Sequence, residues 1–279
     1  MNVGMTRILI TNDDGVDAPG IRVLAEAVAG AGHEVVVAAP REEASGMSAA
    51  LTAVTVSGRV VMEKRNFNTI PGYAVSASPA YIAVLAGLGV FGPPPDVVLS
   101  GINLGANAGN AVLHSGTVGA ALTAVNNGVR HAMAVSLDVL NPTVATVSSG
   151  GAAITVPDAA ALHWRTAAEM AADLLGWLVE APPRTVLNLN VPDREKSAVA
   201  GLRQASLATF GQVQMAVAES GEDFVRTSVE RSGEELVEGT DIAWLADGYA
   251  TVTPLQPPVA IPEVRIPAQR GSVPRSSGV

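Results

Sequence analysis

Two adjacent aspartates, Asp13 and Asp14, are the first residues in the chain whose type and spacing could do chemistry. They follow the strand-like run Arg7–Thr11 and lie in the turn-forming segment Asn12–Gly20. Neighbouring carboxylates repel each other unless a cation or hydrogen-bond donors offset their charge, and such oxygen ligands suit Mg²⁺, Mn²⁺ or Ca²⁺. Aspartates also cap helices and form turns without any metal. The pair alone therefore fits a metal site and a simple turn equally well.

A long glycine-rich segment, Ser100–Gly119, is the second candidate for chemistry. Its glycines would let the backbone approach a ligand, and Asn103 and Asn107 offer amide oxygen to a metal or amide nitrogen to a phosphate. Ser115–Thr117 precedes a predicted helix, so its N–H groups and hydroxyls would face an anion. The alternative is a flexible loop whose serine or threonine is an ordinary helix cap. Loops of this length between buried elements are more often functional.

A third polar loop, Ser45–Ser48, follows the second predicted strand and by itself indicates no more than a surface turn. Among the histidines, His114 lies in the glycine-rich segment, where it could donate a proton or contact a substrate. Several familiar signatures are missing from the sequence. There is no G-x-G-x-x-G after the first strand, no Walker A motif, no G-x-S-x-G and no H-E-x-x-H.

The elements around these loops alternate between strand and helix, which predicts a Rossmann-like, mostly parallel sheet flanked by helices. Arg7–Thr11 and Val35–Ala39 are strands of the fully buried type, separated by the predicted helix Ile21–Ala29. Ligands of such sheets bind beyond the carboxyl ends of the strands, where the polar loops begin. Shorter strands are predicted within 51–62 and 69–75, around Gly58 and Pro71. Further strands are predicted at 96–100, 132–137 and 186–190, and further helices at 79–88, 118–127 and 159–178.

The alternation is lost beyond residue 192, although we expect one α/β domain over residues 1–255 with its core at 5–138 and 158–192. The segment 201–231 predicts antiparallel strands, 239–246 a short helix and 248–253 a last strand. Residues 139–157 are rich in Thr, Ser, Gly and Pro, which is typical of an exposed insertion. The tail 256–279 contains several prolines and is expected to be extended or disordered.

Composition excludes several classes of protein. With 17 basic against 26 acidic side chains and no Lys/Arg cluster, the chain has no footprint for nucleic acid. Because there are no cysteines, disulfides, cysteine–zinc sites and thiol nucleophiles are excluded. No apolar run reaches the roughly 18 residues of a membrane span, and the N-terminus lacks the apolar core of a secretory signal. We therefore expect a cytoplasmic protein without a membrane partner.

Four blocks in this order make the combined pattern specific, and together they resemble the SurE family of 5′-nucleotidases, also called stationary-phase survival proteins. The blocks are ILITNDDGVDAPGI (8–21), VVVAAPREEASGMS (35–48), PDVVLSGINLGANAGNAVLHSGTVGAA (95–121) and TDIAWLADGYATVTPL (240–255). The resemblance implies a divalent-metal-dependent phosphatase of nucleoside 5′-monophosphates; other phosphomonoesters and short polyphosphate stay open as substrates. It also implies a C-terminal β-rich portion, here 193–255, that exchanges elements between subunits of a homodimer or homotetramer. The family's Gly-Thr-Pro motif is replaced by Ala77-Ser78-Pro79, which leaves substrate preference open.

The resemblance also assigns roles to individual residues. The family's metal ligands fall on Asp13, Asp14, Ser45 and Asn103, which would hold one Mg²⁺ or Mn²⁺ per subunit. Its phosphate contacts fall on Asn107, Ser115, Gly116 and Thr117, and Asn12 beside the aspartates is expected to join them. The metal would orient or acidify a water for in-line attack on phosphorus. Attack by one of the aspartates is the rival chemistry, and the residues do not choose between the two.

Two other readings of the same residues stay open. A nucleotide- or phosphate-binding protein could keep this pocket without turnover. A receiver-type signalling domain also has an acidic pair after its first strand, but it is much shorter and needs a lysine near the site. The two lysines of this chain, Lys64 and Lys196, do not follow a late core strand.

Overall fold

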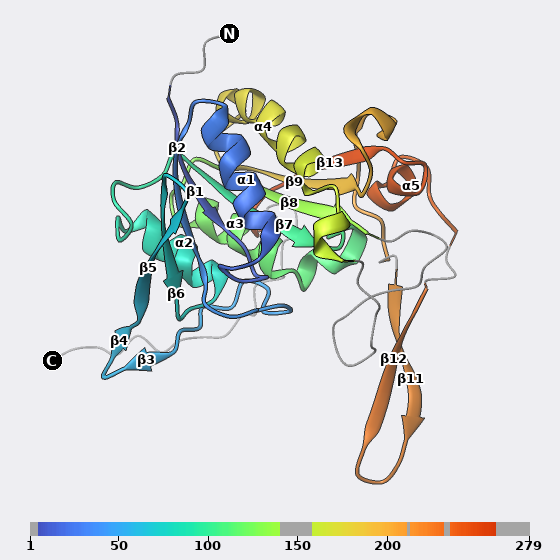
Figure 1. Cartoon of the computed structure of the whole chain (residues 1–279). Coiled ribbons are helices and arrows are strands. Elements are labelled where there is room, and N and C mark those ends of the chain that lie inside the picture. The colour runs from blue at the N-terminus through green and yellow to red at the C-terminus, as the bar shows by residue number, and fades with distance from the viewer. Residues whose placement is uncertain (1–4, 140–157, 211–212, 232–234, 261–279) are drawn as a thin grey trace, which may run out of the picture.

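A nine-stranded sheet forms the centre of the structure (Figure 1). This computed structural model describes residues 5–139, 158–210, 213–231 and 235–260. The strands from β6 through β2, β1, β7 and β8 to β9 are parallel, whereas β5 and β13 run antiparallel to their inner neighbours. The predicted mostly parallel α/β fold is therefore confirmed. Across the sheet the strands are β10 (Leu202–Gln204), β13 (Ala250–Leu255), β9 (Thr185–Pro192), β8 (His131–Asp138), β7 (Val97–Leu104), β1 (Arg7–Thr11), β2 (Glu34–Pro40), β6 (Ile70–Val75) and β5 (Met62–Phe67).

The strand order reverses at β1. From β1 the chain adds β2 and then β6 on one side, and it later returns to place β7, β8 and β9 on the other side. In open α/β sheets ligands bind at such a reversal, outside the carboxyl ends of the strands. Asp13 and Asp14 follow β1, and Asn103 lies near the end of β7, so these candidate residues belong to the reversal point.

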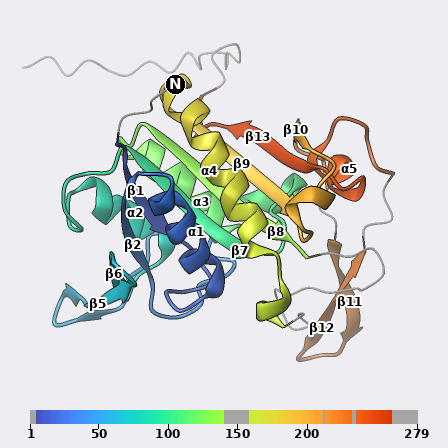
Figure 2. The ribbon, with the colours of Figure 1, turned by 45° about the horizontal axis from the view of Figure 1, so that its top comes forward.

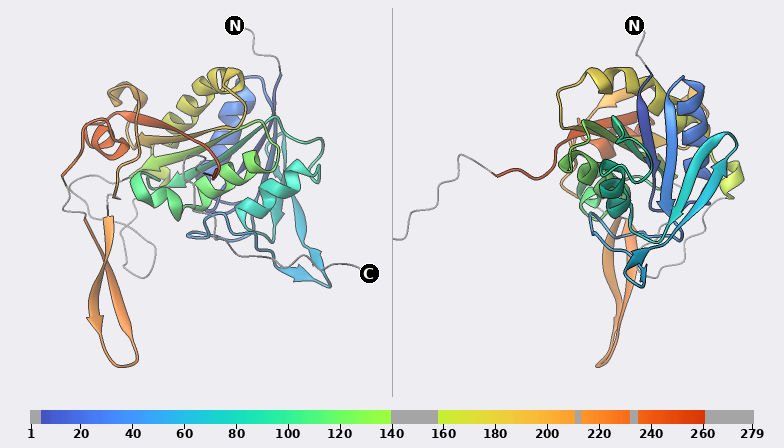
Figure 3. Two further views of the ribbon diagram at one scale, coloured as in Figure 1. Left: turned by 180° about the vertical axis from the view of Figure 1, so that it is seen from behind. Right: turned by 90° about the vertical axis from the view of Figure 1, so that its left-hand side faces the viewer.

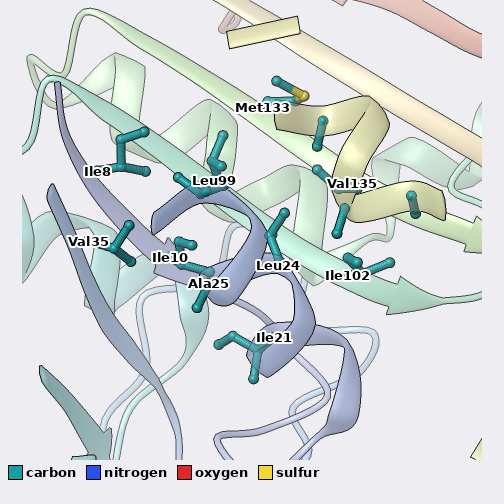
Figure 4. Close-up of a cluster of buried hydrophobic side chains, with 14 of the residues drawn as sticks. Ile8, Ile10, Ile21, Leu24, Ala25, Val35, Leu99, Ile102, Met133 and Val135 are labelled. Atoms are coloured by element: carbon teal, nitrogen blue, oxygen red, sulfur yellow. The ribbon is translucent and has the colours of Figure 1, made fainter. Parts of the chain in front are cut away.

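Helices cover both faces of the sheet (Figures 1 and 2). On one face lie α1 (Pro19–Gly30) and α4 (Trp164–Glu180), and on the other lie α2 (Pro79–Gly87) and α3 (Gly116–Asn126). Figure 4 shows Ile21 and Leu24 of α1 against Ile10 of β1 in the first of these layers. Branched aliphatic side chains and alanines fill both cores, because aromatic residues make up only 4% of the chain.

Strand β7 contains a bulge that matters for the site. Ser100 is paired with Ala134 of β8, but Asn103 rather than Ile102 is paired with Ser136, so β7 carries an extra residue. A bulge re-aims the side chains that follow it. Here Ile102 joins the core under α1 and α4, and Asn103 comes into register with a polar row of the neighbouring strand.

Most predicted elements are present. The shorter strands predicted within 51–62 around Gly58 are β3 (Thr55–Val56) and β4 (Arg59–Val60), which form a hairpin. Leu51, Val54 and Val56 in this segment are exposed. Strand β7 continues to Leu104, four residues past its predicted end at Ser100.

The C-terminal portion is divided between the central sheet and a projecting hairpin. Strands β10 and β13 extend the sheet, and α5 (Asp241–Ala246) packs beside them. Strands β11 (Val213–Ser220) and β12 (Val225–Arg231) form an antiparallel hairpin that projects from the rest of the chain (Figures 1 and 3). The predicted insertion at 139–157 lies outside the described residues except for Val139, and so does the tail from residue 261 onward. Among the described helices, none combines the length and apolar character that a bilayer crossing requires.

Candidate metal centre and phosphate-binding loops

The turn after β1 carries both aspartates and is held rigidly. The amide nitrogen of Asn12 donates to the carbonyl of Gly15 at 2.9 Å, and the backbone N–H of Val16 donates to the carbonyl of Pro40 at 2.8 Å. Asp13 is only 4% exposed, and Asp14 is partly buried. The turn chemistry expected for this segment is therefore present, and Asn12 performs it, while the two hydrogen bonds that hold the turn use neither aspartate carboxylate.

Three other segments meet at the aspartate pair. From the loop after β2, the backbone N–H of Ala44 donates to the carbonyl of Asp13 at 2.7 Å. From the end of β7, the backbone N–H of Leu104 donates to the Asp14 carboxylate. From the start of α3, the hydroxyl of Thr117 donates to Asp13 Oδ1. Loops far apart in the sequence thus converge on these two carboxylates.

The N-terminus of α3 is built around Asp13. Ser115 caps the helix, since its Oγ accepts from the backbone N–H of Val118 at 3.0 Å. Thr117 donates to the Asp13 carboxylate through its backbone N–H as well as its hydroxyl. A side chain at Gly116 would lie 2.7 Å from Asp13 Oδ2, so only glycine allows this approach. The positive end of the helix therefore faces an anionic group of the protein itself, Asp13. Its expected contact with phosphate stays a prediction.

Burial leaves the charge of the aspartate pair poorly compensated. It raises the pKa of Asp13, although the hydrogen bonds from Thr117 act in the opposite direction. Burial, then the charge of Asp13 and then that of Glu43, raise the pKa of Asp14 to about 7. Two ionised carboxylates at this position cost free energy unless a positive charge joins them.

The oxygen atoms left over fit a hard divalent cation. Asp14 Oδ2 is buried and has no hydrogen-bond partner among the described residues. The amide nitrogen of Asn103 donates to the carbonyl of Gly105 at 2.8 Å, which leaves its oxygen available. The hydroxyl of Ser45 donates to Glu43 at 2.7 Å, which leaves its lone pairs available. Carboxylate, amide and hydroxyl oxygens are the ligands of Mg²⁺ and Mn²⁺.

The donor set contains few charged groups. Within the described ranges no cluster of three or more His, Asp or Glu side chains could hold a metal, so neutral oxygens would have to complete a shell around the two aspartates. Ser45 lies on an exposed loop, whereas Asn103 is partly buried at the end of β7. Glu43 was not predicted as a site residue, but it also belongs to the candidate metal centre. It accepts a hydrogen bond from Ser45, and its charge raises the pKa of Asp14.

Asn107 lies deeper than a residue of a surface loop. It is 8% exposed, and its amide nitrogen donates to the Ser136 hydroxyl of β8 at 2.9 Å. Its backbone is bonded to Asn188 and Asn190 of β9. These partners were not foreseen as site residues, although the alternating asparagines in the apolar run VLNLNVP were a signal for them. His114 lies on the exposed surface beside Ser115, at the end of the short helix η1 (Gly109–Leu113).

Comparisons with known proteins identify the family of the chain. The family model described as survival protein SurE matches residues 8–214. The 5′-nucleotidase SurE of Aeromonas hydrophila is 34% identical over 254 residues, which cover 89% of this chain and 91% of the relative. That of Thermosynechococcus vestitus is 36% identical over 258 residues, covering 89% and 90%. The crystal structure of the SurE protein from Aquifex aeolicus superposes with a TM-score of 0.69 at 26% identity and covers 90% of this chain and 93% of that one. The chain belongs to the SurE family.

Proposed function

We propose that this chain is a metal-dependent 5′-nucleotidase that hydrolyses nucleoside 5′-monophosphates to nucleoside and phosphate. The observation that carries the proposal is the buried aspartate pair with an unpartnered Asp14 Oδ2, next to a helix N-terminus at the reversal point of the sheet. The relatives named 5′-nucleotidase SurE match 89% of the chain and so include all of these segments.

One Mg²⁺ or Mn²⁺ ion per chain would be held by Asp13, Asp14, Ser45 and Asn103, with waters completing its shell. When bound, such an ion polarises a phosphate oxygen and lowers the pKa of a water. The fit of the donor set supports this assignment, since Asp14 Oδ2 has no hydrogen-bond partner among the described residues, and Asn103 and Ser45 donate to Gly105 and Glu43 and so keep their oxygens available.

The phosphate would lie between the metal ligands and the start of α3. Asn107, Ser115 and Gly116 would bind and orient its oxygens. Thr117 and Asn12 were also expected to contact the phosphate, but Thr117 donates its backbone N–H and its hydroxyl to Asp13, and the amide nitrogen of Asn12 donates to Gly15, so we propose that these two residues hold the aspartates in place. Backbone N–H groups at a helix N-terminus stabilise negative charge on the oxygens of a transferring phosphoryl group. Asp13 and Asp14 would act in catalysis by holding the metal ion, whose positive charge would position the attacking water. A water is our preferred nucleophile, because hydrogen bonds from Thr117 already engage Asp13.

An assay of phosphate release tests the proposal. The purified protein should release phosphate from AMP or GMP with Mg²⁺ or Mn²⁺ and lose this activity in EDTA and as Asp13→Asn. Asp17→Asn is the matched control, since Asp17 is an exposed aspartate of the same turn. Binding of AMP without phosphate release under any divalent metal would identify a non-catalytic binding protein. The stereochemistry at phosphorus, followed with a chiral ¹⁸O-labelled phosphorothioate analogue of AMP in ¹⁷O-labelled water, separates the two nucleophiles. Inversion would support direct attack by water, whereas retention would support an aspartate that is phosphorylated and then hydrolysed.

We also propose that the chain forms a homodimer or homotetramer through the β11–β12 hairpin. Val217, Phe224 and Val225 of this projecting hairpin are 55–65% exposed, and a lone two-stranded hairpin is at best marginally stable in water. A second subunit would cover these side chains. Light scattering after gel filtration should show an oligomer for the native chain and dissociation for Phe224→Asp; a native monomer would contradict the proposal.

A further inference from the structure

Asn107 is held by a buried network of polar side chains at the carboxyl ends of β8 and β9. Its backbone N–H donates to Asn190 Oδ1 at 2.8 Å, and its carbonyl accepts from the amide nitrogens of Asn188 at 2.7 Å and Asn190 at 3.1 Å. Its own amide nitrogen donates to Ser136 at 2.9 Å. Ser136, Asn188 and Asn190 are all fully buried. We call these three residues the asparagine clamp.

The clamp fixes both the backbone and the side chain of Asn107. The side-chain amide of Asn190 accepts from the backbone N–H of Asn107 and donates to its carbonyl, so it fixes the backbone of Asn107 through two hydrogen bonds. A side-chain amide carries two N–H donors, and Ser136 accepts one of them. The second N–H and the amide oxygen then point in directions that the Ser136 hydrogen bond sets. A donor oriented in this way needs no rearrangement when an anion arrives.

Stability alone does not explain these asparagines. Buried polar groups cost free energy unless they are hydrogen-bonded, and Asn188 Oδ1 has no partner among the described residues. Apolar side chains would suit this part of the sheet better, as Val186 does earlier in β9. Imperfectly satisfied polar groups of this kind cluster at functional sites.

A second contact holds the same loop a short distance further along the chain. Asp241, the first residue of α5, is fully buried and accepts from the backbone N–H of Gly109 at 2.8 Å. Its other oxygen accepts from Ala208 at 3.0 Å and Ile242 at 2.9 Å. A side chain at Gly109 would lie 2.0 Å from the carbonyl of Phe210, so the loop and the C-terminal portion are in direct contact.

We propose that Ser136, Asn188 and Asn190 are positioning residues that hold Asn107 with one amide N–H directed at the phosphate, and that Asp241 anchors the far end of this loop. The proposal rests on the proposed function for the identity of the anion. It gives the C-terminal portion a role inside each active site, besides any contact with another subunit. The clamp would act on phosphate rather than on the metal, because no hydrogen bond of the clamp involves Asp13, Asp14 or Asn103.

Binding of inorganic phosphate and binding of Mn²⁺ are the two measurements that separate this role from a structural one. In Asn190→Leu, which matches the side chain in size, we expect phosphate affinity and kcat/KM for AMP to fall about 100-fold, as for a small misplacement of a binding group. Mn²⁺ affinity, measured by electron paramagnetic resonance, should change less than about twofold, because the metal ligands keep their contacts. Ser136→Ala, a smaller change, should lower phosphate affinity about tenfold, and Ser136→Thr, which keeps the hydroxyl, should restore most of it.

Thr251→Val is the matched control for polarity. This buried residue lies opposite Asn190 and makes no hydrogen bond to Asn107, so phosphate affinity should not change. Unchanged phosphate affinity in both Asn190→Leu and Ser136→Ala, or an equal loss of Mn²⁺ and phosphate binding, would overturn the proposal. If Asn190→Leu does not fold, Ser136→Ala decides alone. If the native protein binds phosphate but hydrolyses no nucleotide, the proposed function fails while the phosphate measurements still test the clamp.

Discussion

The aspartate pair follows β1 and the asparagine clamp lies on β8 and β9, with β7 between them in the same sheet. The two regions differ in what they leave unsatisfied. Asp13 and Asp14 concentrate negative charge in a buried turn, with raised pKa values and an oxygen without a partner. The clamp is neutral, and each of its residues is hydrogen-bonded to Asn107 at 2.7–3.1 Å, although Asn188 Oδ1 has no partner among the described residues. The difference indicates a division of labour. One region is built to receive a cation, and the other is built to hold a donor in place for an anion.

The largest effect should follow from neutralising the unpartnered aspartate. We predict that Asp14→Asn lowers kcat/KM for AMP by at least about 1,000-fold, because it removes a charged ligand and with it most of the metal affinity. Steady-state kinetics at saturating Mn²⁺ measures this. Asp17→Asn, in the same turn but exposed, should stay within about twofold of the native value, as surface changes usually do. A loss in both variants would mean that the turn itself, and not its charge, is critical.

The second effect concerns pH and the metal-free protein. The pKa of Asp14 is raised from 3.8 to about 7 on folding, so its protonated form contributes stability that is fully present below pH 3.8 and is lost as the pH rises through about 7. We predict that the free energy of unfolding in EDTA, relative to Asp14→Asn, falls by a few kcal/mol between pH 4 and pH 8, at up to roughly 1.4 kcal/mol per pH unit.

Urea titrations of the native chain and of Asp14→Asn across this pH range measure the difference. Added Mn²⁺ at pH 8 should restore the stability of the native chain and leave the variant unchanged. Parallel pH curves for the two proteins would show that the charge of Asp14 is already compensated in the absence of metal.

A smaller effect is expected at the start of α3, where Thr117 contacts Asp13. Thr117→Val removes the hydroxyl that donates to Asp13 and keeps the shape of the side chain. We predict a loss of Mn²⁺ affinity of about tenfold to 100-fold, the usual range for partners of a metal ligand, with most of it restored in Thr117→Ser. Isothermal titration with Mn²⁺ tests this. Equal Mn²⁺ affinity in the native chain, Thr117→Val and Thr117→Ser would show that α3 does not contribute to metal binding.

The smallest effect should come from Ser45, the most exposed of the four proposed ligands. In Ser45→Ala a water can take the place of the hydroxyl, so we predict a loss of Mn²⁺ affinity of only a few-fold. The same titration measures it. A loss as large as that of Asp14→Asn would mean that the loop after β2 closes over the metal more tightly than its exposure suggests.

Much of the fold could be predicted from the sequence, because its strands and helices carry strong local patterns. β1 and β2 are continuous buried runs, and α1 and α4 show helical spacing. The short strands around Gly58 were also predicted, and they form the β3–β4 hairpin. The bulge in β7 was missed, since its effect depends on pairing with β8.

The candidate site was predictable to the extent that its residues are neighbours in the sequence. Asp13 and Asp14 form a local motif, whereas Asn190 lies 83 positions from Asn107 and Asp241 lies 132 positions from Gly109. Such partners depend on the three-dimensional register of β9 and α5, which no local pattern encodes. Glu43 was overlooked for a similar reason, because its influence on the pair depends on how the loop after β2 folds back.

Titration of the metal-free protein with Mn²⁺ tests the metal centre most directly, at pH 8 and with Asp14→Asn and Asp17→Asn in parallel. We predict one Mn²⁺ per chain for the native protein and for Asp17→Asn, and no measurable binding for Asp14→Asn. Equal Mn²⁺ binding by Asp14→Asn, or phosphate release from AMP by a native protein that binds no divalent metal, would contradict the assignment of Asp13 and Asp14 as a metal centre.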